Sequence, residues 1–197
     1  MAAPPALAPF RGGCAWTRRL LALALACCAT AAGAADDDAR QLEVQVKAAY
    51  LYKFAGHVEW PPAAYVDAAA PFTIGVVSAG DIAEELVRLQ AGRSVNERPV
   101  EVRVLKAGEP ARGVQIVFVG GADSAQLRRL LEPFKAAPTL TVSDLPGAIE
   151  AGCVINFVLV DKRLRFEVSR VNAERHGLKV SSRLLAVAQR VDSGRRE

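Results

Sequence analysis

The stretch from residue 153 to residue 191 constrains the fold of this chain more than any other. Residues 154–160 form a nearly continuous apolar run, as expected of a β-strand that is covered on both faces. Two polar residues, Asp161 and Lys162, separate this run from residues 163–169, in which apolar and charged side chains alternate. Alternation is typical of a strand with one face in solvent, and a two-residue link predicts an antiparallel hairpin. We therefore expect a C-terminal hairpin at one edge of a sheet.

Strand-like and helix-like segments alternate in the part of the chain before this hairpin. Apolar runs predict strands at residues 72–77, 99–105, 114–119 and 138–142, and helical periodicity predicts helices at residues 43–58, 82–89, 124–134 and 145–151. Such alternation is typical of right-handed crossovers between parallel strands. The sequence therefore predicts an α/β fold: a three-layer sandwich with a mostly parallel sheet of about six strands and an antiparallel C-terminal edge hairpin.

Residues 1–34 have the pattern of a secretory signal peptide. Three arginines are the only charged residues before Asp36, residues 20–26 form a short apolar run, and Ala34 ends a small-residue cleavage site. The apolar run is too short to span a bilayer. We expect export, with cleavage near Ala34. A true start codon downstream of the first methionine and lipidation at Cys27 are the alternatives that the sequence leaves open.

Removal of this leader changes the charge and the thiol content of the chain. Three of the 25 basic residues are lost with it, which leaves 22 against 21 acidic residues. The mature chain is thus nearly neutral, and no basic patch predicts a nucleic-acid partner. Cys153 is the one cysteine that remains, so we expect no intramolecular disulfide. The length predicts a single domain at residues 35–191, followed by a flexible tail at residues 192–197.

The residue patterns that enzymes commonly need are missing from the mature chain. Its two histidines, His57 and His176, lie beside glycines and in no metal-ligand spacing, and no dinucleotide fingerprint or nucleophile elbow is present. Cys153 begins a buried strand, where a free cysteine acts as a small apolar residue, although a cysteine–histidine pair stays open. Asp144 follows a strand, and capping of the next helix explains it. We predict no enzymatic activity, no catalytic residues, no cofactor and no bound metal.

Partner binding is the class of function that remains, and two surfaces are candidates for it. The first helix and the segment after it contribute Phe54 and Trp60, and the edge hairpin contributes Arg165, Phe166 and Glu167. We predict that these five residues contact a partner. Two alternatives stay open: the aromatic residues pack on the sheet, and the charged edge is a solvated surface that prevents aggregation.

A set of short motifs follows in a fixed order along the whole mature chain. They comprise residues 50–54 (Tyr-Leu-Tyr-Lys-Phe), 59–61 (Glu-Trp-Pro), 72–76, 140–144, 155–157, 165–168, Asn172, 177–178 and 180–185. Their order and spacing together resemble the YfiR-like family of periplasmic regulators. Two positions depart from the family pattern: Lys53 stands where asparagine is common, and Gly113 stands where a cysteine often precedes the third strand.

The resemblance implies a small periplasmic α/β regulator that is often a dimer and has no catalytic activity. The member that names the family represses the inner-membrane diguanylate cyclase YfiN by binding its periplasmic sensor region. An outer-membrane lipoprotein draws that repressor away, which raises cyclic diguanylate and favours biofilm. The name-giving protein relies on disulfides, whereas the single Cys153 of this chain leaves no intramolecular redox switch.

By this resemblance we expect a homodimer whose partner is the periplasmic region of an inner-membrane cyclase or kinase, with an outer-membrane lipoprotein as a further partner. A non-catalytic repressor of signalling is thus the leading interpretation. The alternative is a periplasmic small-ligand binding domain that reports a solute to a sensor kinase.

Overall fold

The computed structural model describes residues 37–110, 112–121 and 123–194. The chain divides into two compact units, Met1–Leu42 and Glu43–Glu197. The described residues of the first unit are helical, and the sheet and all sites below belong to the second unit. The predicted signal peptide lies outside the described residues. No helix in the described part of the chain is long and apolar enough to cross a membrane.

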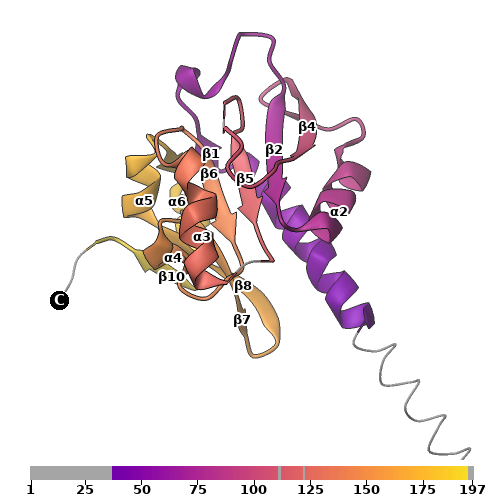
Figure 1. Ribbon diagram of the computed structural model, residues 1–197, viewed down its shortest axis with the longest axis vertical. Coiled ribbons are helices and arrows are strands. Elements are labelled where there is room, and N and C mark those ends of the chain that lie inside the picture. Colours follow the sequence, from indigo (N-terminus) through magenta and orange to yellow (C-terminus); the bar gives the residue numbers. More distant parts are fainter. Residues whose placement is uncertain (1–36, 111, 122, 195–197) are drawn as a thin grey trace, which may run out of the picture. The chain divides into compact units, whose positions relative to one another are not determined.

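Eight strands of the described chain form the central sheet, in the order β10-β8-β7-β6-β5-β2-β4-β3 (Figure 1). They are β2 (Phe72–Val77), β3 (Ser94–Val95), β4 (Arg98–Val104), β5 (Ile116–Val119), β6 (Leu140–Ser143), β7 (Ile155–Val160), β8 (Arg163–Ser169) and β10 (Arg190–Asp192). The pairs that join β4, β2, β5, β6 and β7 are all parallel, and β8 is antiparallel to β7. The predicted mostly parallel sheet is confirmed, with the short strands β3 and β10 added at its two ends.

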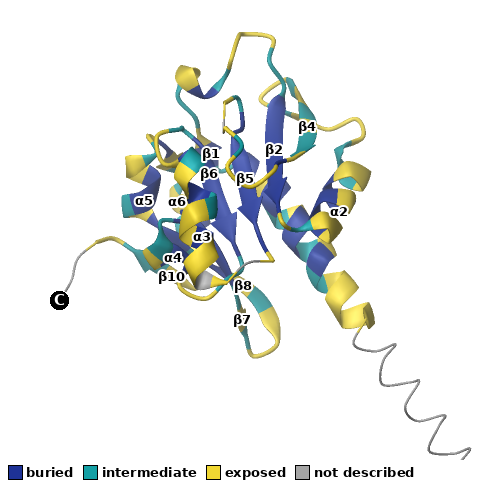
Figure 2. Ribbon diagram, in the orientation of Figure 1, coloured by how far each residue is buried: buried dark blue, intermediate teal, exposed yellow. Residues whose placement is uncertain are grey.

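Helices cover both faces of this sheet, as the predicted three-layer arrangement requires (Figures 1 and 2). The residues of β5 alternate between two cores: Ile116 and Phe118 pack with the N-terminal helix (residues 43–55) and α2 (Gly80–Gln90), whereas Val117 and Val119 pack with α3 (Ser124–Leu131) and α4 (Ala148–Ala151). Successive residues of a strand point to opposite faces, so the two cores lie on opposite sides. The remaining elements are β1 (Val58–Glu59), η1 (Pro62–Ala64), η2 (Glu132–Phe134), α5 (Arg170–Arg175), β9 (Lys179–Val180) and α6 (Ser182–Ala186).

The predicted C-terminal hairpin is present, and Asp161 and Lys162 form its turn. Asp161 and Lys162 have φ angles of 50° and 60°. Two successive residues with positive φ are the mark of a type I′ turn, which matches the twist of the strands that it joins. The structure corrects one detail of its environment: β10 pairs with β8 along Glu167–Ser169, so only the outer half of the hairpin is an edge.

Candidate functional site

Two of the five predicted partner-binding residues, Phe54 and Phe166, lie in the core. Their side chains are 0% and 3% exposed, and their rings meet edge to face with centroids 5.2 Å apart. Tyr50 and Phe157 complete the cluster, at 5.8 Å from Phe54 in both cases. Aromatic pairs of this kind contribute about 0.5–1.5 kcal/mol beyond the apolar area that they bury. The two rings fix the base of the hairpin on the N-terminal helix, so any role in partner binding is indirect.

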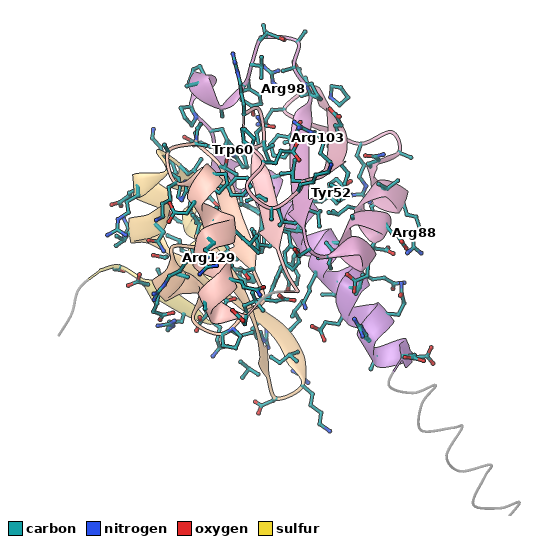
Figure 3. The ribbon with its side chains drawn as sticks, viewed as in Figure 1. Tyr52, Trp60, Arg88, Arg98, Arg103 and Arg129 are labelled. Carbon is teal, nitrogen blue, oxygen red and sulfur yellow. The ribbon has the colours of Figure 1, made fainter. Side chains whose placement is uncertain are left out.

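Trp60 is partly buried and has a structural contact at each end of its ring system (Figure 3). Its ring packs edge to face on Phe72, with centroids 5.1 Å apart, and its Nε1 donates a hydrogen bond to the Gln115 carbonyl at 3.0 Å. Gln115 is itself fully buried, and its side chain accepts from the Thr73 amide and donates to the Ala64 carbonyl. Trp60 therefore anchors the segment after the first helix to the amino-terminal ends of β2 and β5.

Glu167 and Arg165 differ in how far their side chains are already paired. Arg190 donates two hydrogen bonds to the Glu167 carboxylate, from Nε at 2.8 Å and from a terminal nitrogen at 3.0 Å. This bidentate pair ties β10 to β8, and it leaves the Glu167 side chain 18% exposed. Arg165 is exposed and forms no ion pair within the described residues. Of the five predicted residues, Arg165 is the one best placed to contact a partner.

The outer half of the β7–β8 hairpin extends past the rest of the sheet (Figures 1 and 2). Pairing between β6 and β7 ends at Asn156, and pairing between β10 and β8 begins at Glu167. Residues 157–166 therefore form a two-stranded arm that pairs with no other strand, and at its base the Phe166 carbonyl accepts a hydrogen bond from the Gln189 amide. We call these residues the arm. Both of its edges carry backbone groups that no neighbouring strand of the sheet satisfies, which is the arrangement that favours strand addition.

The arm combines open edges with an apolar side chain and an excess of basic charge. Leu159 is 62% exposed although it lies within a strand. Lys162, Arg163 and Arg165 are exposed, and Asp161 is the one acidic residue among them. None of the three cations has an ion-pair partner in the part of the chain that the structure describes. The arm therefore suits an acidic, extended segment of another protein.

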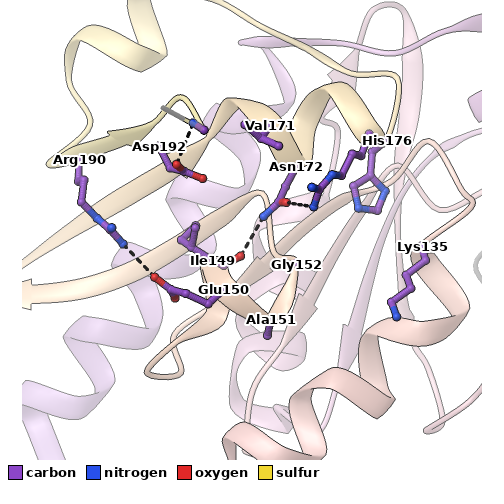
Figure 4. Close-up of a pocket in the computed structure, with 12 residues that line it drawn as sticks. Lys135, Ile149, Glu150, Ala151, Gly152, Val171, Asn172, His176, Arg190 and Asp192 are labelled. Atoms are coloured by element: carbon purple, nitrogen blue, oxygen red, sulfur yellow. Dashed lines mark hydrogen bonds and ion pairs between the residues drawn. The ribbon is translucent and has the colours of Figure 1, made fainter. Parts of the chain in front are cut away.

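A separate polar cleft of about 740 Å³ lies between α4, α5 and the C-terminal strand (Figure 4). Its cations are largely compensated: Lys135 pairs with Glu132, and Arg190 pairs with Glu150 at 3.7 Å as well as with Glu167. Asp192 accepts a hydrogen bond from the Ser169 hydroxyl at 2.8 Å, and this bond lowers the pKa of Asp192. The charges in the cleft thus tie β10 to the rest of the fold more than they present a binding surface.

Asn172 is the central polar residue beneath this cleft (Figure 4). It is 5% exposed, and its Nδ2 donates to the carbonyls of Ile149 and Cys153 at 2.9 and 2.8 Å. Its Oδ1 accepts from Arg175 at 3.3 Å, so both ends of the amide are satisfied. Asn172 joins α5 to both ends of the α4 segment, which accounts for an asparagine in this buried position.

Cys153 is 0% exposed, and burial raises the pKa of its thiol to about 12, with a hydrogen bond to Thr141 acting in the lowering direction. Since the thiolate is the reactive form, we expect native protein that begins at residue 35 to react with a thiol reagent at pH 8 at least about a thousandfold more slowly than urea-unfolded protein. The absorbance change of an aromatic disulfide reagent measures both rates. Comparable rates in the two states would contradict the buried position of this thiol.

The sequence did not indicate a partly buried ionic cluster beside the arm. Lys47 lies within 2.6 Å of Asp144 and 2.5 Å of Glu43. The prediction that Asp144 caps the following helix is wrong, since α4 begins at Ala148 with Gly147 as its N-cap. The amphipathic pattern of the first helix was the one available signal, because it places a lysine among apolar residues. In the described ranges, no group of three or more histidine, cysteine or acidic residues could hold a metal ion.

Comparison with known proteins identifies the family of this chain. Residues 44–189 match the family described as YfiR/HmsC-like, which covers nearly all of the folded unit. No curated protein matches the sequence. The matched range includes nearly all of the N-terminal helix, every strand of the central sheet except β10, and the arm. The chain therefore belongs to the YfiR/HmsC-like family, which is known for the periplasmic regulation of signalling.

Proposed function

We propose that this protein is a non-catalytic periplasmic repressor that binds the periplasmic region of an inner-membrane signalling protein. The partner that we propose is a diguanylate cyclase, so that repression lowers cyclic diguanylate and release favours biofilm. The observation that carries the proposal is the arm, which offers open strand edges, an exposed Leu159 and three uncompensated cations. Membership of the family supports the regulatory part of this proposal.

Repression by this route needs no chemistry, only a difference in affinity. A ligand shifts a two-state partner toward the state that it binds more tightly, and by no more than its differential affinity allows. Moving a sensor from 1% to 99% inactive takes roughly a 10⁴-fold preference, or about 5.5 kcal/mol. A short added strand together with a few charge contacts lies within that range, because individual interface residues contribute up to several kcal/mol.

The proposed partner segment is extended and acidic. Phe166 O accepts a hydrogen bond from the Gln189 amide, so the backbone of Phe166 faces away from β7. Leu164, two residues earlier, faces the same way, and its cross-strand partner Leu159 faces outward on the opposite edge. Leu159 on one edge and Leu164 on the other therefore each offer one N–H and one C=O for strand addition, and Arg163 and Arg165 flank Leu164 on the β8 edge.

Two further features of the proposal come from the family alone. We propose that the protein works as a homodimer and that an outer-membrane lipoprotein competes with the inner-membrane partner for it. Competition between two partners for one surface is enough to make release depend on the lipoprotein. The exported form that we propose begins near residue 35.

A crosslinked pull-down of the mature protein from native membranes tests the proposal. We expect mass spectrometry to identify an inner-membrane protein that has a periplasmic sensor region and a cytoplasmic cyclase domain. Recovery of a kinase in place of a cyclase would keep the repressor role and correct the partner. Recovery of no membrane protein, under conditions where a tagged control succeeds, would overturn the proposal in favour of the solute-binding alternative.

A further inference from the structure

A notch of about 380 Å³ lies where β6 ends and β7 continues into the arm. Its walls come from three parts of the chain: the N-terminal helix, the segment that follows β6, and the β7–β8 hairpin. Its volume is at the lower end of the range of about 300–1,000 Å³ that is typical of small-ligand sites. The notch lies at the carboxyl end of a parallel strand, which is where ligands bind in open α/β sheets.

The charged residues of the notch carry an excess of one negative charge. Lys47 Nζ is 2.6 Å from Asp144 Oδ2 and 2.5 Å from Glu43 Oε1, so a single cation serves two carboxylates. The Lys47 side chain is only 10% exposed. Burial by itself lowers the pKa of Lys47, but the hydrogen bonds to Asp144 and Glu43 outweigh burial and raise it. Lys47 is therefore committed to its two partners, and a second cation would balance the remaining charge.

The notch also contains a buried amide oxygen that lacks a hydrogen-bond partner among the described residues. Asn156 is 4% exposed, and its Oδ1 has no hydrogen-bond partner among the described residues. A buried polar group left unsatisfied costs about 1–3 kcal/mol. Such groups are rare, and a ligand that donates a hydrogen bond would satisfy this one.

Apolar side chains form the rest of the walls. Leu145 and Phe157 line the inner part of the notch together with Leu164, and the exposed Leu159 lies at its arm side. We propose that the notch binds a primary amine or guanidinium that is carried on an apolar body. The cationic head would lie beside Asp144 and Glu43, and the apolar body would cover Leu159. This inference concerns a different ligand from the arm's partner and does not depend on the proposed function.

Titration of the purified protein with phenethylamine, followed by calorimetry and NMR, tests this inference. We expect saturable binding that shifts the signals of the Asn156 side-chain amide and the Leu159 methyl groups. The neutral isostere 2-phenylethanol should bind at least about tenfold more weakly, because it lacks the charge that the two carboxylates require. Equal binding of the amine and the alcohol would overturn the inference, as would the absence of any amine binding at millimolar concentration.

Charge-neutralising substitutions show whether the notch is the site. Asp144→Asn and Glu43→Gln should each weaken phenethylamine binding at least about fivefold. Each substitution also removes one of the two partners of the buried Lys47, so both variants are tested, and far-ultraviolet circular dichroism confirms that each is folded. Glu84→Gln removes the same charge from an exposed position of α2 and should leave binding unchanged. Unchanged affinity in a folded Asp144→Asn or Glu43→Gln protein would refute the assignment.

The same cationic chemistry has two natural sources, and a third titration distinguishes them. A blocked peptide with one lysine between two leucines presents the amine as a protein side chain. Tighter binding of this peptide than of phenethylamine would assign the notch to a lysine of another protein. Weaker binding would assign it to a free solute amine.

Discussion

Replacing Phe54 with alanine is expected to lower the free energy of unfolding by about 3–5 kcal/mol. The side chain is 0% exposed and contacts three aromatic rings, so its removal leaves a cavity that the sheet cannot close. The cavity lies between the N-terminal helix and the base of the hairpin. Urea unfolding followed by circular dichroism measures the difference in the free energy of unfolding. If the variant keeps the wild-type slope of this free energy against urea concentration, its unfolding is still two-state.

Leu159→Ala is the matched control for this prediction. Leu159 belongs to the hairpin against which Phe54 packs and is also a large apolar residue, but it is 62% exposed. Its truncation should change the free energy of unfolding by about 0.5 kcal/mol or less. If the two variants lost similar stability, the aromatic cluster would not hold the hairpin on the helix as described above. The comparison also separates partner contact from folding, because Leu159 remains available to a partner and Phe54 does not.

The sequence predicted those elements whose patterns are local. The residues of β2 are all buried, as a run of apolar and β-branched residues indicates. The antiparallel hairpin with its turn at Asp161 and Lys162 followed from the two-residue spacing between strands. β10 was missed because Arg190–Asp192 is too short and too polar to be predicted as a strand, and because its pairing with β8 is a long-range contact that no local pattern indicates.

The first helix shows why helical periodicity alone can misplace a buried face. The helix that we predicted at residues 43–58 rests on apolar residues at three- and four-residue spacing, which are Leu42, Val46, Ala49, Tyr50, Phe54 and Val58. Of these six residues, only Phe54 and Val58 are buried in the structure; Val46 and Tyr50 are partly buried, and Leu42 and Ala49 are exposed. The other buried residues of this segment are Val44, Ala48, Leu51, Tyr52 and Ala55. Apolar residues occur on nearly every side of this helix, so several stripes fit the sequence almost equally well. Packing on both the sheet and α2 selects among them, as the hydrogen bond from the Tyr52 hydroxyl to the Leu86 carbonyl shows.

The candidate site could be predicted only in part, because residue type does not determine exposure. An aromatic residue and a charged residue on a hairpin are equally plausible partner contacts in sequence, yet Phe166 is buried and Arg165 is exposed. Whether an arm exists depends on where pairing with the neighbouring strands β6 and β10 stops, and this depends on contacts between segments that are far apart in the sequence. The ionic cluster could not be predicted from local patterns, since Lys47 and Asp144 are 97 residues apart.

Reversing two charges of the arm, Arg163→Glu with Arg165→Glu, is expected to weaken binding of the membrane partner's periplasmic region about a hundredfold. Both side chains are exposed and unpaired among the described residues, so the variant should fold normally. Opposite charges across an interface raise the association rate, and like charges placed opposite one another cost several kcal/mol. Surface plasmon resonance against the sensor region recovered in the pull-down measures the loss of affinity. We expect the substitutions to lower mainly the association rate, and the loss of affinity to become smaller as salt is added.

The double variant Arg128→Glu with Arg129→Glu separates a local effect of the arm from a change in net charge. It makes the same change of four charge units at exposed positions of α3, outside the arm (Figure 3). If long-range attraction between two oppositely charged proteins drove binding, the two variants would lose similar affinity and the loss would vanish in high salt. If the arm is the contact surface, only the arm variant loses affinity, and part of the loss persists in high salt because like charges remain buried against the partner. Full affinity in a folded arm variant would refute the arm as the binding surface while leaving the family's regulatory role intact.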